Sequence, residues 1–228
     1  MNRAYRNPVL QQLHAAAGDR ALSGLSEVVY QTGKTWPGNA ASQPQFWFPD
    51  GGVLALEQKA QATHVEVALL GGASGVPLPG QEGMRLRALT DGRAHVLPAE
   101  VVLSISPDLF LRCQQVLVEQ MARWAYCARH HGPAQGLADR LLWAHQGCPQ
   151  EALGWSVRDL LGCHALSPDQ MDRAVQALVR AGGARLQGSL LHLQDLRVLE
   201  AKACGCHSGP AMHAAGSTEA GTRASTGH

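Results

Sequence analysis

The sequence contains no apolar run that approaches the ~18 residues needed for a membrane-spanning helix. Its opening residues, MNRAYRNPVLQQLH, lack the apolar core of a secretory signal peptide. Its 6 cysteines are spread over 228 residues, which is too long a chain for a small disulfide scaffold. We therefore expect a cytoplasmic protein with reduced thiols and no contact with a membrane.

The chain also lacks a charge imbalance and a recognisable catalytic motif. Its formal net charge is +1 at pH 7, so bulk charge favours neither a nucleic-acid nor a membrane partner. We find no phosphate-cradling glycine loop, no nucleophile elbow and no zinc-protease motif, and an enzyme is not expected. A chain of 228 residues that is 45% hydrophobic and 16% charged predicts one large domain or two small ones.

Residues 8–104 have the pattern of an antiparallel barrel that serves as a sensor-like domain. After an opening helical stretch, short strand-like runs such as QFWFPDGGVLALEQ and THVEVALLGG are punctuated by Gly, Pro and Asp. That rhythm is typical of a small antiparallel barrel or sandwich.

Residues 105–132 predict one long helix that pairs with a second copy of the chain. Ser106 is the expected cap and Pro107 the first helical residue. Apolar side chains then recur in steps of three and four, which is the spacing of a packing seam. The predicted dimer interface consists of Phe110, Cys113, Leu117, Met121, Trp124 and Ala128.

Residues 133–206 have the order of a winged helix-turn-helix. The helix PAQGLADRLLWAHQG is followed by WSVRDLLGCHA, with Ser156 as cap, and by SPDQMDRAVQALVRAGG. In this last helix Ser167 is the expected cap, Gln170 completes a capping box and Gly182 ends the helix. A hairpin that turns at Gly188-Ser189 follows. Residues 207–228 are small, polar and aperiodic, and we expect them to be disordered.

Several of these segments resemble motifs of one family in order and spacing. FWFPDGGVLAL is similar to "hxYFPxxGxhxxh", THVEVALLGGASGV to "xxVEVAxhGxEGhxG", and LEAKACGC to an "LEAxACEC" ending. SVRDLLGCHALSPDQMDRAVQALVRAGG resembles "TQEELAxxLGVSRETVSRALRRLExAG" without a gap. Over residues 9–206 the chain therefore resembles the Crp/Fnr superfamily of bacterial transcription regulators.

The resemblance implies an α+β fold with an N-terminal antiparallel β-barrel of cyclic-nucleotide-binding type, a long dimerisation helix and a C-terminal winged helix-turn-helix. It implies a homodimer that binds double-stranded DNA at a palindromic operator, with RNA polymerase as a further partner and a small-molecule effector of unknown identity. The residues that it assigns to DNA binding are Ser156, Ser167, Asp169, Gln170, Arg173, Gln176 and Arg185.

The chain departs from the family at its reading helix. Pro168 stands where the family carries an Arg, and Ala165 stands at the usual turn Gly. Between residues 151 and 200 the chain has five Arg (158, 173, 180, 185, 197) and six acids (151, 159, 169, 172, 195, 200), a net charge of −1. Because phosphate neutralisation supplies most DNA affinity, we expect weak and strongly salt-dependent binding.

The effector is not expected to be a cyclic nucleotide. In the segments GGASGVPLPG and QEGMRLRAL the chain lacks the Gly-Glu and Arg-Ser pairs of the cyclic-nucleotide-binding members, and Arg85 and Arg87 are the only nearby arginines. An iron–sulfur sensor of the family uses an N-terminal cysteine cluster, whereas the first cysteine here is Cys113. We predict no cofactor and no metal ion.

Two alternatives remain open. One is a family-derived protein-interaction module that has lost DNA binding. The other is a haem or thiol redox sensor with DNA output. Its haem ligands would come from His64, His95 or Cys113. Its thiol or metal site would use Cys204, Cys206 and His207, and a metal would also need His213 or Cys148 to complete four ligands.

Overall fold

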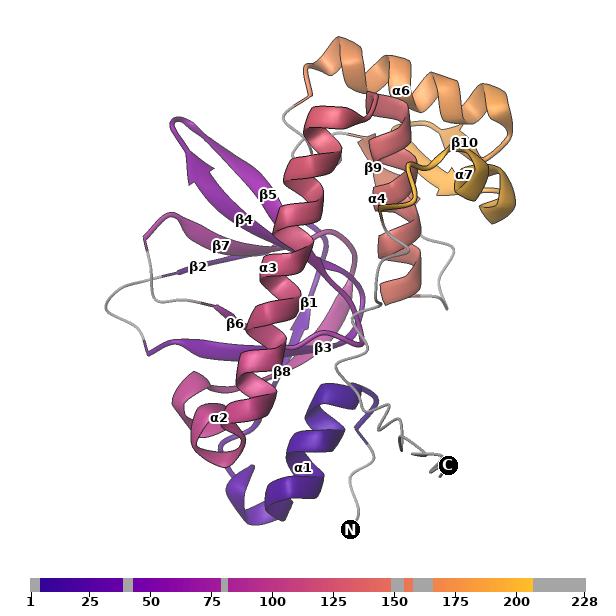
Figure 1. Ribbon diagram of the computed structural model, residues 1–228. Helices are drawn as coiled ribbons and strands as arrows, with labels where there is room; N and C mark the ends of the chain where they lie inside the picture. Colours follow the sequence, from indigo (N-terminus) through magenta and orange to yellow (C-terminus); the bar gives the residue numbers. More distant parts are fainter. Residues whose placement is uncertain (1–4, 39–42, 79–81, 149–153, 158–165, 207–228) are drawn as a thin grey trace, which may run out of the picture.

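The computed structural model of the chain describes residues 5–38, 43–78, 82–148, 154–157 and 166–206. A β-rich half, a long helix and a C-terminal group of helices and short strands follow one another along the sequence (Figure 1). Within the described part no helix combines the length and apolar character that a membrane crossing requires.

Eight strands make two antiparallel sheets in the N-terminal half. One sheet has the order β1-β8-β3-β6, with strands Ser26–Tyr30, Gly92–Pro98, Gln45–Gly51 and Val76–Leu78. The other has the order β2-β7-β4-β5, with strands Thr35–Pro37, Met84–Ala88, Leu54–Ala60 and Thr63–Leu70. Leu54, Leu56 and Leu86 are fully buried in the core that the strands share. The predicted antiparallel sheet architecture is confirmed.

Helices α1 (Pro8–Ala21) and α2 (Ala99–Ile105) close one end of this β domain. The side chain of the buried Asn7 fixes the start of α1, because its Oδ1 accepts hydrogen bonds from the backbone N–H groups of Val9 and Leu10, both at 3.0 Å. Its Nδ2 donates to the carbonyls of Pro49 and Ser74 at 2.7 and 2.8 Å. One buried side chain therefore caps the helix and ties it to the barrel.

Helix α3 (Pro107–His130) begins as the sequence predicts, with Pro107 in its first turn and Ser106 Oγ accepting from the Leu109 N–H. Its predicted seam, however, faces the chain's own barrel. Cys113 is buried at 3% exposure, and Phe110 and Leu117 pack against barrel clusters.

This packing assigns Phe110, Cys113 and Leu117 of the predicted seam to contacts within the chain, and the dimer interface itself stays a prediction. Trp124 packs on the core around the C-terminal helices, and Met121 and Ala128 are exposed. A three-four apolar spacing shows that one helix face is covered, but it does not distinguish a second chain from a barrel of the same chain.

Among the described residues, the C-terminal part has three helices and a small sheet. The helices are α4 (Pro133–Gly147), α6 (Pro168–Ala181) and α7 (Leu196–Lys202), and the antiparallel sheet has the order β10-β11-β9, with strands Ala184–Gln187, Leu190–Leu193 and Gly154–Ser156. The predicted hairpin turn after Gln187 is confirmed. Most of the predicted helix WSVRDLLGCHA, with Ala165, and residues 207–228 lie outside the described residues.

A buried ion pair joins the barrel to α4. Arg140 on α4 donates from Nε to Glu66 Oε1 on β5 at 2.7 Å, and its Nη2 donates to the second carboxylate oxygen. The two side chains are 2% and 0% exposed. The Arg140 guanidinium also lies 6.0 Å from the ring centre of Trp155 on β9, within the range of a cation–π contact. Arg140 therefore contacts both the barrel and the C-terminal sheet.

The same junction includes a close approach of two backbones. Gly72 N–H donates to the Gly147 carbonyl at 2.8 Å. A Cβ added at Gly71 would overlap the backbone of Gly147, so only glycine fits there. The Gly71-Gly72 turn thus packs on the end of α4.

Candidate nucleic-acid interface and thiol cluster

Helix α6 presents a polar face to solvent over a well-capped apolar scaffold. Met171, Ala174, Val175 and Leu178 are buried against the C-terminal core. The opposite face is exposed to solvent. It carries side chains that recur along the helix in steps of three and four: Asp169, Asp172, Arg173, Gln176 and Arg180. An amphipathic helix with arginine and glutamine one turn apart can place donors against a phosphate or a base edge.

The predicted capping box at the start of α6 is confirmed. Ser167 Oγ accepts from the Gln170 N–H at 3.3 Å, and Gln170 Oε1 accepts from the Ser167 N–H at 2.9 Å. Gly182 ends the helix in the left-handed conformation, with φ 82°. Two of the residues predicted to bind DNA, Ser167 and Gln170, therefore also stabilise the helix start.

The two remaining predicted DNA contacts lie on the adjoining sheet. Arg185 is exposed on β10, opposite His192 of β11. Ser156 lies at the end of β9, opposite Leu190 of β11. The sequence did not predict β9, because three residues are too few to show a strand pattern. The structure thus brings Ser156 and Arg185 to one three-stranded sheet, formed by β9 before α6 and the β10-β11 hairpin after it.

The charge of this region is close to balanced. Residues 166–206 contain five basic residues (173, 180, 185, 197, 202) and four acidic residues (169, 172, 195, 200), a net charge of +1. Asp195 is engaged as the cap of α7, where it accepts from the Arg197 N–H at 2.9 Å. The exposed face of α6 itself carries two arginines and two aspartates, so its attraction to phosphate depends on a few side chains.

Two arginines of the barrel, Arg85 and Arg87, pair with the same carboxylate. Glu57 on β4 accepts from Arg85 Nε at 2.6 Å and from Arg87 Nε at 2.5 Å. Burial raises the pKa of Glu57, but the hydrogen bonds and charges of Arg87 and Arg85 outweigh this effect, and the net pKa is lowered. Glu57 is therefore ionised at neutral pH, and its single negative charge offsets one of the two guanidinium charges in the region where the sequence places the anion site.

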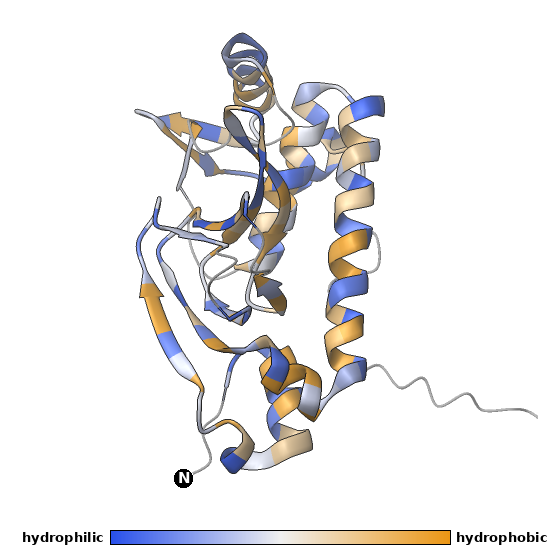
Figure 2. Ribbon diagram, turned by 90° about the vertical axis from the view of Figure 1, so that its left-hand side faces the viewer, coloured by the Kyte–Doolittle hydropathy of each residue, from blue (hydrophilic) through white to orange (hydrophobic). Residues whose placement is uncertain are grey.

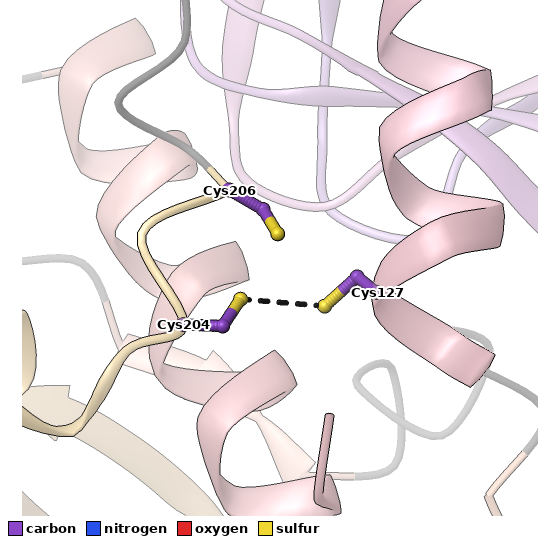
Figure 3. Close-up of side chains that lie close together, drawn as sticks. All are labelled: Cys127, Cys204 and Cys206. Atoms are coloured by element: carbon purple, nitrogen blue, oxygen red, sulfur yellow. Dashed lines mark hydrogen bonds between the residues drawn. The ribbon is translucent and has the colours of Figure 1, made fainter. Parts of the chain in front are cut away.

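Three cysteines converge at the end of α3. Cys127 Sγ lies 3.5 Å from Cys204 Sγ, and the sulfur atoms of Cys127, Cys204 and Cys206 all lie within 4.8 Å of one another (Figure 3). Burial is the main cause that raises the pKa of Cys127 to about 11, and it also raises the pKa of Cys204. These two thiols therefore carry their protons at neutral pH in the absence of a metal ion.

Sequence reasoning found two of these cysteines and missed the third. It sought a further ligand from Cys148, which is instead buried in the core around α4, or from His213, which lies outside the described residues with His207. Cys127 and Cys204 are 77 residues apart, so no local spacing motif links them. In the part of the chain that the structure describes, this is the one cluster of three potential metal ligands.

The residues considered as haem ligands lie on separate elements. His64 is on β5, His95 on β8, and Cys113 on α3. The Cys113 thiol is packed in the core, and burial raises its pKa to about 12. A thiolate haem ligand at Cys113 is disfavoured because deprotonation there is costly.

No protein-family model matches the chain, and no curated protein sequence matches it. Several solved structures do match the chain in fold. A CRP-family transcriptional regulator from Thermus thermophilus is 11% identical with a TM-score of 0.64, and the match covers 82% of this chain and 100% of that one. A CRP/FNR-family transcriptional regulator from the same organism is 20% identical with a TM-score of 0.56, covering 78% and 98%.

A CooA mutant from Carboxydothermus hydrogenoformans is 11% identical with a TM-score of 0.59, and the match covers 87% of this chain and 97% of that one. These matches extend over nearly the full length of the solved chains, so they include the barrel, α3 and the C-terminal elements together. The chain therefore has the same fold as these solved regulators, which is the fold that its resemblance to the Crp/Fnr superfamily implied.

Proposed function

We propose that the chain is a DNA-binding transcription regulator that acts as a homodimer. The observation that carries this proposal is the exposed polar face of α6, with Arg173 and Gln176 on an intact, capped scaffold followed by a hairpin. In a winged helix-turn-helix such a helix enters the major groove and the hairpin contacts the backbone beside it. The likeness in fold to solved transcription regulators supports the same conclusion.

The outer face of α3 supports the homodimer. In the chain alone, Leu111 and Val118 are 62% and 61% exposed. They belong to a stripe of exposed residues in alternating steps of four and three: Leu111, Gln115, Val118, Ala122 and Ala125. Exposed apolar residues at this spacing are typical of a helix that pairs with a copy of itself. Figure 2 shows α3 along one side of the molecule, with strongly apolar positions along its length.

The barrel supports an effector other than a cyclic nucleotide. Both arginines of the expected anion region are paired with Glu57, and the Gly71-Gly72 turn packs on Gly147 of α4. A cyclic phosphate needs an arginine or backbone donors aimed at it. An anion there would have to share these two guanidinium groups with the largely buried Glu57 carboxylate.

The direct test of the reading helix is the variant Arg173→Ala. We expect it to weaken binding to a duplex from the DNA upstream of the protein's own gene by about 1–3 kcal/mol if Arg173 contacts a base. Fluorescence anisotropy titrations at low and moderate salt measure this loss. Arg197→Ala, on α7 away from the α6 face, is the matched control and should bind nearly as the parent does.

Asp172→Lys tests the same face in the opposite direction. It replaces an exposed acid on α6 with a base, so affinity should rise for most duplex sequences, with a steeper salt dependence. The proposal fails if the parent protein binds no duplex at low salt and neither substitution has an effect. The near balance of charge in residues 166–206 would then favour a protein-interaction module that has lost DNA binding.

A further inference from the structure

The thiol cluster joins two segments that the sequence separates widely. Cys127 lies in the last turns of α3, whereas Cys204 and Cys206 follow the end of α7. In Figure 3 the three side chains point toward a common centre. Because the contact spans 77 residues, anything that binds all three sulfur atoms fastens the end of the C-terminal module to the long helix.

The sulfur spacing suits one metal ion. Zinc binds thiolate sulfur at ~2.3 Å, which places the sulfur atoms of a tetrahedral site ~3.8 Å apart. The sulfur atoms of Cys127 and Cys204 are 3.5 Å apart, and all three sulfur atoms lie within 4.8 Å of one another. The expected sulfur–sulfur distance falls between these two values. We propose that Cys127, Cys204 and Cys206 bind one thiophilic ion of the zinc type.

Three converging thiols favour a metal ion over a disulfide. A disulfide would join two sulfur atoms, require an oxidant and leave the third cysteine without a role. One bound cation, in contrast, engages all three sulfur atoms at once, and each thiol that it coordinates loses its proton.

One member of the cluster borders an open cavity. Cys127 lines a cavity of about 270 Å³, together with His131, Gly136 and Gln170. Three protein thiolates and one water molecule complete a tetrahedral zinc site. The charge of Asp139 on α4 acts on both Cys127 and Cys204, which adds a negative group beside the cation. The site therefore has three converging soft ligands, one of which borders a cavity.

The test uses the full-length protein, reduced and free of metal, with Zn(II) and Co(II) as probes. We expect one equivalent of Co(II) to bind and to produce thiolate charge-transfer absorption with tetrahedral d–d bands. Cys127→Ser, Cys204→Ser and Cys206→Ser should each weaken Zn(II) binding by about 100-fold or more, measured by competition with a chromophoric chelator, because each removes a direct ligand. Zn(II) should also raise the thermal midpoint of the parent protein.

The matched control is Cys113→Ala. Cys113 is a buried thiol on the same helix, ~21 Å from Cys127 along the helix axis. Its replacement by alanine should therefore leave the affinity for Zn(II) unchanged. Parent-like affinity in all three cluster variants, or a Co(II) complex without thiolate bands, overturns the proposal. So does a reduced protein that binds no Zn(II) but forms a Cys127–Cys204 disulfide in air. None of these readouts depends on DNA binding.

Discussion

Replacing Arg140 with alanine is expected to lower the free energy of unfolding by about 3–5 kcal/mol. The substitution leaves the Glu66 carboxylate, which is 0% exposed, as a buried charge without its arginine. It also removes the guanidinium that lies over the Trp155 ring. Urea denaturation followed by circular dichroism measures the change, with the slope of the transition used to check that unfolding stays two-state.

The double variant Glu66→Met, Arg140→Met is the control for this prediction. Replacing both charges with apolar side chains of similar length removes the uncompensated charge, so the double variant should be clearly more stable than Arg140→Ala. A loss below about 1 kcal/mol in Arg140→Ala would contradict the buried ion pair as the link between barrel and α4, since exposed pairs contribute about that much or less.

Val118→Asp is expected to convert the proposed dimer to a monomer. Val118 is at the centre of the exposed α3 stripe, and two-fold symmetry would bring both copies of the new carboxylate to the same interface. Taking each charge out of water costs several kcal/mol, and the two carboxylates repel each other. Analytical ultracentrifugation across a range of protein concentrations should then show monomer where the parent sediments as a dimer.

Arg112→Asp is the matched control on the same helix. Arg112 is exposed and lies about 100° around α3 from Leu111, off the stripe, so an acid there should leave the dimer intact. A Val118→Asp protein that remains as dimeric as the parent would show that chains pair elsewhere or not at all. Retained helical content by circular dichroism separates dissociation from misfolding.

The elements that sequence reasoning predicted well are those whose signals are local. Ser167, Gln170 and Gly182 are capping residues, which occupy fixed positions relative to the helix ends. The structure confirms the helix that begins and ends at these residues. The same is true of Ser106 and Pro107 at the start of α3. Such signals depend on backbone hydrogen bonding within one turn, so they do not require knowledge of the tertiary fold.

The features that the sequence could not predict depend on which surfaces meet. The spacing of Phe110, Cys113 and Leu117 correctly indicates a buried face on α3, but their partner is the barrel of the same chain. Val118 and Leu111, which are exposed, form a second apolar stripe that the first one obscured. A helix that is covered on one side and exposed on the other can carry an apolar stripe on each side, and periodicity alone does not identify the partner of either stripe.

Contacts between residues that are far apart in the sequence could not be predicted either. Glu66 and Arg140 are 74 residues apart, and nothing in the local pattern of β5 or α4 marks either as buried. Cys127 has the same position in the α3 pattern as Cys113, so it was not distinguished from an ordinary core thiol. Only the packing of α7 against α4 and the return of the chain toward α3 bring Cys204 beside it.

The measurement that tests the central claim most directly is selection of bound duplexes from a random-sequence pool by the full-length protein at low salt. A homodimer that reads DNA through α6 predicts an enriched motif with two-fold symmetry, whose half-sites lie about one helical turn apart, ~34–36 Å. Arg173→Ala should relax the enrichment at one position in each half-site. A pool that shows no enrichment over its input, or one enriched for a sequence without two-fold symmetry, would contradict the account.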